Sequence, residues 1–389
     1  MRLLILLSST CTFFNLYQLQ ALYPWLATKY NTDLTLAGWL NMACLLGMMI
    51  TAPFANRITR GFSPPRIILA GIGCLGLLNI GVGLSESTKA LFSVRLLQGL
   101  VLPCILTTIM EIVGRTKNDS IRLKWVSYYV AGTILGSTLS RFYPAFSVDF
   151  LGWQGGFITS AGLLFSACLL IFHYARNFPT DVGRVVSSGF CHQQLIKRAL
   201  TEKRLIIAYS IGFGLLYSQS SIFTALGLYL AQPPISQTSQ EIGLIYLACL
   251  PALLAVLISP ILHEIQKEKT ISVSLVILFW ISIFLMGNQY TLVLLGVAGF
   301  SISTYLMQTQ TTRMISKVCQ IPVTLSSGLY LSFYYGGGSL GASLSAFAFH
   351  HWGWMGVLTF VSTAQILILI FIVLMSTFFR KKEIFDVNA

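Results

Sequence analysis

Charged residues are scarce in this chain. Asp, Glu, Lys and Arg make up 10% of its 389 residues, whereas hydrophobic residues make up 55%. Soluble globular proteins carry about 25% charged residues, because charged side chains cover the surface that faces water. A soluble core cannot account for this apolar excess. The composition therefore excludes an ordinary soluble protein and favours one surrounded by lipid.

Patterns that bind metals or cofactors, or that support catalysis, are also missing from the sequence. The eight cysteines and five histidines are scattered, with no Cys-x-x-Cys pair and no cluster with metal-ligand spacing. No Gly-rich phosphate loop follows a strand pattern, and no nucleophile motif stands in a suitable context. We therefore expect no metal site, no cofactor and no enzymatic activity, and we interpret the cysteines as small packing residues.

Long apolar segments recur from one end of the sequence to the other. A helix that rises 1.5 Å per residue needs about 20 residues to cross the hydrocarbon of a bilayer. Such segments predict about twelve membrane-spanning helices, at residues 3–27, 35–55, 67–85, 90–112, 125–147, 153–174, 205–230, 242–262, 271–287, 291–312, 325–349 and 354–377.

The basic residues lie on one side of this predicted topology. The formal net charge is +13, and 21 of the 25 Lys and Arg residues fall in alternate connections or near the two termini. The exceptions are Lys29 and Lys89 on the other side, and Arg95 and Arg141 inside predicted helices. This positive-inside pattern predicts a multi-pass protein of the cytoplasmic (inner) membrane with both termini in the cytoplasm. The basic charge thus indicates topology and contact with the lipid bilayer, and we expect no nucleic-acid partner.

An internal repeat is present at an offset of 205 residues. The segment 132–142 aligns without gaps on 337–347, and both copies then reach a Gly-Trp pair, at 152–153 and 353–354. A second match at the same offset joins the second predicted helix to the eighth. Six helices separate each matched pair, so both copies should cross the membrane in the same direction.

The repeat predicts an all-α membrane protein built from two parallel six-helix bundles, at residues 1–175 and 205–378. The longest polar stretch, 176–204, is predicted to be a cytoplasmic linker between them. It either lets two rigid bundles move or is a tether that carries an interfacial helix. Residues 379–389 are predicted to form a cytoplasmic tail.

Two local motifs add to this architecture. The first is the basic segment 52–61 after the second predicted helix, which contains Asn56 and Arg57, and the second is the run 95–99 (Arg-Leu-Leu-Gln-Gly) in the fourth. With the two six-helix halves and the basic central stretch, they resemble the major facilitator superfamily over essentially the whole chain. In that family the position of Asn56 holds an acid that helps to latch the halves by charge pairing. The neutral Asn56 weakens the expected latch, and an ordinary basic loop is the alternative.

Arg95 is the most specific part of this resemblance. It lies about 10 Å inside the bilayer, where a guanidinium costs several kcal/mol unless it faces a cavity or a partner. In proton-coupled members of the family this arginine is associated with proton movement, and a clamp on backbone carbonyls is the alternative. Glu111 is the one acid clearly inside a predicted helix, and Asp33 stands just before another. Proton coupling would use one of them with Arg95, unless Glu111 simply pairs with the neighbouring Arg115.

The fifth predicted helix carries a Gly-x-x-x-Gly pattern at 132–136 and a second intramembrane charge, Arg141. The glycines allow close helix packing. Efflux members of the family often have a proline where this chain has Ser137, so this motif does not decide the direction of transport. Arg141 has no repeat mate, because Ala346 takes that position. It either contacts the solute or gates its path, or it snorkels to the outer headgroups.

The resemblance implies that the first, fourth, seventh and tenth helices line a central cavity. Amides there are costly without a hydrogen-bond partner, so they should face each other, water or a solute. The candidate solute contacts are Asn15, Tyr17, Gln18, Tyr217, Gln219, Tyr305 and Gln308.

These observations predict a secondary active transporter that moves a small solute by alternating access. The resemblance to the drug:proton antiporter and sugar-efflux branch favours proton-coupled efflux of a metabolite or drug-like compound by a monomer, with the solute and protons as partners. Uptake or uniport of a small anionic nutrient is the alternative within transport, because both buried charges are arginines. A receptor or scaffold that transports nothing is the alternative of another class.

Overall fold

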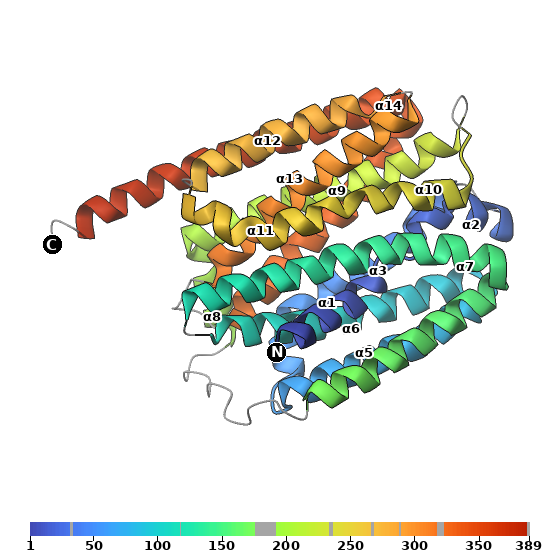
Figure 1. Ribbon diagram of the computed structural model, residues 1–389, viewed down its shortest axis with the longest axis horizontal. Helices are drawn as coiled ribbons and strands as arrows, with labels where there is room; N and C mark the ends of the chain where they lie inside the picture. Colours follow the sequence, from blue (N-terminus) through green and yellow to red (C-terminus); the bar gives the residue numbers. More distant parts are fainter. Residues whose placement is uncertain are drawn as a thin grey trace.

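The computed structural model describes residues 1–31, 34–116, 118–175, 192–232, 236–265, 268–287, 289–316 and 323–386, and the regular elements in these ranges are helices. Most helices run side by side along the long axis of the molecule (Figure 1). Helix α8 and the end of α14 lie at one end, which we name the α8 end. Helix α2 and the start of α10 lie at the other, the α2 end.

The first half of the chain forms the elements α1 (Arg2–Phe14), η1 (Gln20–Leu22), α2 (Tyr23–Tyr30), α3 (Leu34–Thr51), η2 (Ala52–Phe54), α4 (Ala55–Ile58), α5 (Pro64–Gly83), α6 (Thr88–Gly114) and α7 (Asp119–Ala175). The second half forms α8 (His192–Thr201), α9 (Lys203–Ala231), α10 (Ser239–Ile245), η3 (Tyr246–Cys249), α11 (Pro251–Ile265), α12 (Glu268–Leu285), α13 (Tyr290–Ser316) and α14 (Val323–Asp386). The predicted linker falls largely on residues outside the described ranges, and α14 continues as a helix past the predicted start of the tail.

Two of these helices contain two membrane spans each. Helix α7 is interrupted at Gly152 (φ 69°, ψ 173°) and α14 at Gly353 (φ 61°, ψ −157°), and both glycines have the positive φ that side chains disfavour. Seven described helices are long and apolar enough to cross a bilayer. Two of them divide at a glycine and shorter apolar helices add further spans, so the chain has about twelve spans, as predicted.

The two hinges confirm the repeat at the level of side chains. Trp153 follows the first hinge and stacks on Trp25 of α2, with ring centroids 4.9 Å apart. Trp354 follows the second hinge and stacks on Tyr229 at the end of α9, at 5.1 Å. Each Gly-Trp pair therefore turns the chain and packs it onto the end of the first span of its own half.

The Gly-x-x-x-Gly patterns pack each half in the same way. A Cβ added at Gly136 would lie 2.4 Å from the carbonyl oxygen of Thr10 in α1. A Cβ added at Gly341 would lie 2.3 Å from the carbonyl oxygen of Tyr217 in α9. The glycines thus bring the fifth span onto the first and the eleventh onto the seventh, backbone against backbone.

One predicted span is wrong in its detail. The sequence predicted an uninterrupted helix over 3–27, but α1 ends at Phe14 and helical structure resumes with η1 at Gln20. The eighth predicted span is also divided, into α10, the 3-10 turn η3 and α11. By contrast, α9, which corresponds to the interrupted first span, is continuous.

The halves meet along two seams. In the first, α3 packs on α14, where the Ser332 hydroxyl donates to the Met49 carbonyl at 2.9 Å and the Ser343 hydroxyl contacts the Met42 sulfur at 3.0 Å. In the second, α7 packs on α10 and α11, and a Cβ added at Gly243 would lie 2.8 Å from the Cβ of Ala145. Contact along both seams closes the two halves onto each other.

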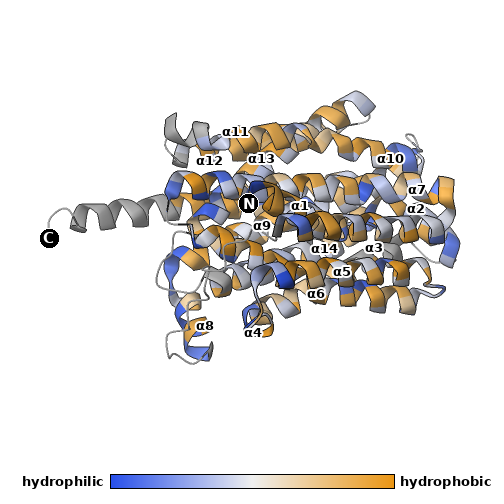
Figure 2. Ribbon diagram, turned by 60° about the horizontal axis from the view of Figure 1, so that its bottom comes forward, coloured by the Kyte–Doolittle hydropathy of each residue, from blue (hydrophilic) through white to orange (hydrophobic). Residues whose placement is uncertain are grey.

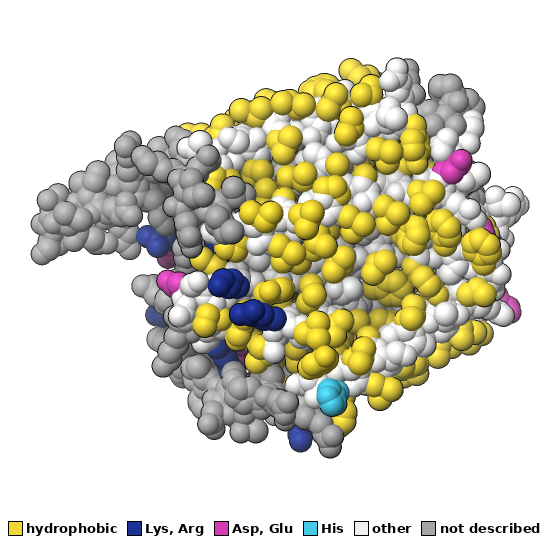
Figure 3. All heavy atoms as spheres, viewed as in Figure 1, with side chains coloured by type: hydrophobic (Ala, Val, Ile, Leu, Met, Phe, Trp, Pro, Cys, Tyr) yellow, Lys and Arg dark blue, Asp and Glu magenta, His cyan; other side chains and the backbone are white. Residues whose placement is uncertain are grey.

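The outer surface fits a bilayer. Hydrophobic side chains cover the middle of the face in Figure 3, and Lys and Arg side chains gather toward the α8 end. Hydropathy colouring likewise shows mainly apolar helices, with polar residues concentrated at their ends (Figure 2). In α8, Leu195 and Ala199 are buried against the bundle, whereas Lys197 and Arg198 are exposed.

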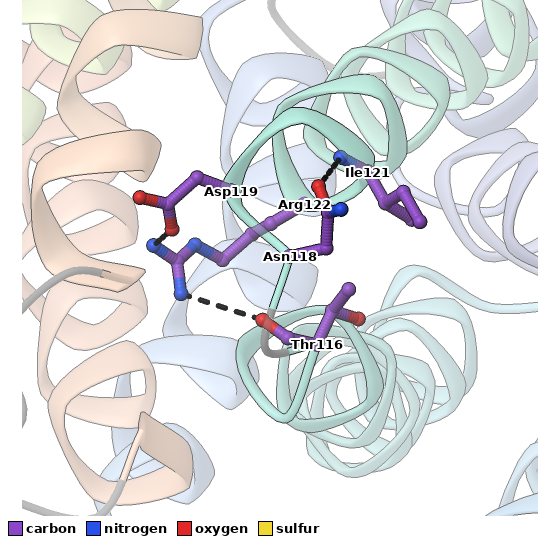
Figure 4. A network of polar contacts seen from close by, with 5 residues as sticks. All are labelled: Thr116, Asn118, Asp119, Ile121 and Arg122. Carbon is purple, nitrogen blue, oxygen red and sulfur yellow. Dashed lines mark hydrogen bonds and ion pairs between the residues drawn. The ribbon is translucent and has the colours of Figure 1, made fainter.

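A small polar network organises the basic connection between α6 and α7 (Figure 4). The Asn118 side-chain oxygen accepts from the Ile121 amide at 3.1 Å and caps the start of α7. Arg122 pairs with Asp119 in the first turn, where a negative charge is favourable, and donates to the Thr116 carbonyl at 3.4 Å. The described residues of this connection therefore cap the start of α7.

The close helix contacts predict sharply different effects for equivalent glycine substitutions. Gly136→Ala and Gly341→Ala should each lower the free energy of unfolding by about 1–3 kcal/mol, because the new methyl group meets backbone atoms that cannot move aside. Gly73 and Gly162 have no such neighbour within 4 Å, so changing them to Ala should cost nothing. Thermal unfolding of the purified protein in detergent measures all four. Equal melting temperatures would contradict the proposed packing.

Candidate functional site

The interruption of the first span lies inside the bundle. Residues 15–19 separate α1 from η1, and all five side chains are buried. Backbone groups without partners are costly inside a bilayer, so non-helical backbone is found only where protein groups or a polar path satisfy it. The partners of this segment therefore show what the interruption is for.

Arg95 of α6 satisfies the carbonyls at the end of α1. Its Nη1 donates to the Asn15 carbonyl at 2.7 Å and its Nη2 to the Leu16 carbonyl at 2.6 Å. The positive charge also lies at the negative end of the α1 dipole. On the other side, the Tyr17 amide donates to the Ser140 hydroxyl of α7 at 2.8 Å. The alternative role given to Arg95, a clamp on backbone carbonyls, is the arrangement that the structure shows.

Three amide side chains extend this clamp through α5 and α6. Arg95 donates to Gln98 Oε1 at 2.6 Å, and Gln98 Nε2 donates to Asn79 Oδ1 at 3.0 Å. Asn79 Nδ2 then donates to Asn15 Oδ1 at 2.8 Å, and because Arg95 bonds the Asn15 carbonyl, this closes a ring of four residues. Asn15, a predicted solute contact, is thus engaged within the first half.

Arg141 has a different environment. Its side chain is 1% exposed, so it does not snorkel to the surface. Its Nε donates to Gln20 Oε1 at 2.6 Å and its Nη1 to the Ser137 carbonyl at 2.8 Å. The guanidinium lies 4.1 Å from the ring centroid of Tyr17, 4.6 Å from that of Phe223 and 5.1 Å from that of Tyr246. Two of these rings belong to the second half, so cation–π contacts join the halves here.

Further polar groups cross the same interface. The Ser137 and Tyr305 hydroxyls lie 2.8 Å apart. Gln219 of α9 lies beside Tyr305, and both are buried. The structure therefore brings predicted residues of the first, seventh and tenth spans, namely Tyr17, Gln219 and Tyr305, to Arg141. We name the set Tyr17, Gln20, Ser137, Arg141, Gln219, Phe223, Tyr246 and Tyr305 the Arg141 cluster.

Other predicted solute contacts lie elsewhere or are less connected. Tyr217 lines a groove of about 420 Å³ within the second half, between α9 and both limbs of α14. The groove is largely aromatic, with Phe213, Phe333 and Phe371 among its lining residues. Gln308 is buried in α13, one turn from Tyr305.

The residues predicted to couple or latch are not brought together with the clamp. Glu111 forms an ion pair with Arg115, as the alternative interpretation had it, and stands about 24 Å along α6 from Arg95. Asn56 is half-buried and Arg57 exposed in α4, which packs between α6 and α14 at the seam of the halves. Asp33 lies outside the described residues.

Sequence reasoning missed several members of the site. Asn79, Ser140 and Gln20 are polar residues inside predicted spans, and that was the only available signal. Phe223 and Tyr246 gave no signal, because buried aromatic residues are common throughout this chain. Their role depends on contacts between spans that are distant in sequence.

The hydrogen bonds of Arg95 should contribute to the free energy of unfolding. Arg95→Ala removes the donors to two carbonyls and to Gln98, and each buried group left without a partner costs about 1–3 kcal/mol. We expect a fall of several kcal/mol in the free energy of unfolding. Arg95→Lys should recover only part of the lost stability. The ammonium keeps the positive charge but lacks the planar fork that binds two carbonyls at once.

Arg115→Ala is the control for this experiment. It removes a partly exposed i,i+4 ion pair, which contributes at most about 1 kcal/mol. Thermal unfolding in detergent compares the three variants. A melting temperature of Arg95→Ala close to that of Arg115→Ala would show that the clamp does not hold the interrupted span.

Comparison with known proteins supports the same family. The Major Facilitator Superfamily model matches residues 5–319. A Buchnera aphidicola (Schizaphis graminum) protein named "Uncharacterized transporter" is 22% identical over 346 residues, which cover 86% of this chain and 79% of the relative. The Escherichia coli O157:H7 "Uncharacterized transporter YgaY" is 22% identical over 358 residues, 88% of this chain and 86% of the relative. Bacillus subtilis YybF, an "Uncharacterized MFS-type transporter", is 21% identical over 300 residues, which cover 76% of this chain and 73% of the relative. The chain therefore belongs to the Major Facilitator Superfamily and is a multi-pass membrane transporter, not an enzyme.

Proposed function

We propose that this transporter exports a small solute, a metabolite or a drug-like compound, across the cytoplasmic (inner) membrane in exchange for protons. The observation that carries the proposal is the Arg141 cluster, a buried polar site whose members come from both halves. A site shared in this way changes its exposure when the halves rock. The chain works as a monomer with both termini in the cytoplasm, so the α8 end faces the cytoplasm.

In this proposal, contacts between the halves break during transport, whereas contacts within the first half do not. The clamp around Arg95 lies within the first half and keeps the interrupted span in place. The contacts of Arg141 with Phe223 and Tyr246, and of Ser137 with Tyr305, cross between the halves. Opening toward one side of the membrane breaks these contacts, while the clamp stays intact. Solute then binds to groups that the halves cover in the closed form.

Uptake or uniport of a small anionic nutrient is the second candidate function. A specific observation favours it: within the described ranges, Arg141 has no carboxylate within ion-pair distance. A positive site without a buried acid attracts an anion in either direction of transport. Direction therefore has to be measured.

Flux in oriented vesicles separates the two candidates. Everted and right-side-out membrane vesicles that contain the transporter are incubated with a defined mixture of small carboxylates, sugars and aromatic cations. Export by proton exchange predicts accumulation in everted vesicles that depends on a pH gradient and disappears with a protonophore. Accumulation in right-side-out vesicles without a pH gradient would overturn export in favour of uptake or uniport. Mass spectrometry of the vesicle contents identifies the solute.

A cross-link tests alternating access itself. The Ser332 hydroxyl of α14 donates to the Met49 carbonyl of α3 at 2.9 Å, so these two positions are neighbours across the first seam at which an engineered disulfide can be tried. Oxidation of the Met49→Cys/Ser332→Cys protein should stop accumulation of every transported solute, and dithiothreitol should restore it. The two single variants serve as controls under the same oxidation, since native cysteines are present in all three. Full flux through the cross-linked protein would show that the halves do not separate at this seam.

A further inference from the structure

The Arg141 cluster has more hydrogen-bond donors than acceptors. A guanidinium carries five N–H groups. Two of those on Arg141 donate to Gln20 and Ser137, which leaves three, at Nη1 and Nη2, without an acceptor among the described residues. The Nε2 amides of Gln20 and Gln219 are also buried without a partner. A site that lacks acceptors is suited to a ligand that brings them.

Gln18 adds a buried amide whose two polar atoms both lack a partner among the described residues. It stands in the interrupted segment between Tyr17, which covers Arg141, and Gln20, which binds it. The clamp fixes the backbone on either side of this segment through Arg95 and Ser140. Burying unpartnered amides costs free energy, so such amides in the Arg141 cluster and in the segment beside it point to binding.

The charge and shape of the cluster narrow the class of ligand. The remaining N–H groups of Arg141 lie in the plane of the guanidinium, where a carboxylate accepts two parallel hydrogen bonds. The rings of Tyr17, Phe223 and Tyr246 lie within 5.1 Å of the same group. They supply an apolar, aromatic wall next to the positive charge. This pairing suits a small molecule with one carboxylate on a flat apolar body.

We propose that Arg141 binds the carboxylate of a small aromatic or apolar monocarboxylate, which this transporter carries. This inference rests on the proposed transport function but not on its direction. When the halves separate, Phe223 and Tyr246 withdraw from Arg141, and the ligand replaces them in contact with the guanidinium. The Nε2 groups of Gln20 and Gln219, one from each half, then donate to the ligand.

The test compares a carboxylate with a neutral molecule of the same shape. Benzoate, cyclohexanecarboxylate and benzamide are titrated into the purified transporter, and thermal unfolding and saturation-transfer NMR follow binding. We expect the two carboxylates to raise the melting temperature of the wild-type protein saturably and benzamide to have no effect. Arg141→Gln should weaken carboxylate binding at least about tenfold, the loss expected when one charge-assisted bidentate pair is removed. Arg141→Lys should recover part of it.

Two control variants separate binding from folding and from general charge. Arg66→Gln removes an equal charge from an exposed position in α5 and should leave carboxylate binding unchanged. Gln219→Leu keeps Arg141 and its rings but removes one of the unpartnered donors, so it should weaken binding less than Arg141→Gln. If Arg141→Gln does not fold, the proposal is tested by saturation-transfer NMR of Gln219→Leu with the same carboxylates. Failure of both carboxylates to bind the wild type, or equal binding of benzamide, would overturn the proposal.

The outcomes also separate this inference from the transport function. Carboxylate binding that depends on Arg141, without any flux in vesicles, would leave the site in place and remove the transport proposal. Flux of sugars or cations that the Met49–Ser332 cross-link stops, without carboxylate binding, would leave transport in place and remove the anion site.

Discussion

An interrupted helix inside a bilayer has to find hydrogen-bond partners for its backbone, and much of the first half is organised around this need. The carbonyls of Asn15 and Leu16 are satisfied by Arg95, and the Tyr17 amide by Ser140. Neutral donors could serve the same carbonyls, but a charge-assisted fork binds two at once and also faces the negative end of α1. The amides of Gln98 and Asn79 complete the ring, so the Arg-x-x-Gln-Gly motif acts as a unit. Its last residue, Gly99, lets α3 approach α6.

Arg95 and Arg141 therefore differ in their contacts, although the sequence presents them alike. Arg95 makes its described hydrogen bonds within the first half, to groups that stay together when the halves move. Arg141 contacts rings of the second half and keeps N–H groups without acceptors. A buried charge is costly unless the groups around it compensate. Arg95 makes three hydrogen bonds, all to groups of the first half, whereas Arg141 makes two and also faces rings of the second half. That contrast is why we assign stability to Arg95 and solute binding to Arg141.

Local sequence patterns were sufficient for the architecture but not for the site. Span length and the 205-residue repeat predicted the number and order of helices, and the Gly-Trp pairs became the hinges at Gly152 and Gly353. The interruption after Phe14 could not be predicted in this way, because residues 15–19 contain neither proline nor glycine. Its cause is the set of partners on α6 and α7, which are more than 75 residues away in sequence. Polar residues inside spans pointed to Asn15, Tyr17 and Gln18, but nothing local distinguished an amide held by the clamp from one without partners among the described residues.

The repeat also shows what the second half has in place of the clamp and the interrupted segment. At the offset of 205, Arg95 corresponds to Phe300 and Gln18 to Phe223. These two phenylalanines pack edge to face with centroids 5.4 Å apart, and α9 continues past them as an unbroken helix. Aromatic packing in the second half thus occupies the positions where the first half has the clamp and the interrupted segment. Phe223 in turn covers Arg141, whose own counterpart is Ala346. The first half supplies Arg141, Gln20 and Tyr17, the second supplies Gln219, Phe223 and Tyr246, and the proposed solute would contact groups of both halves.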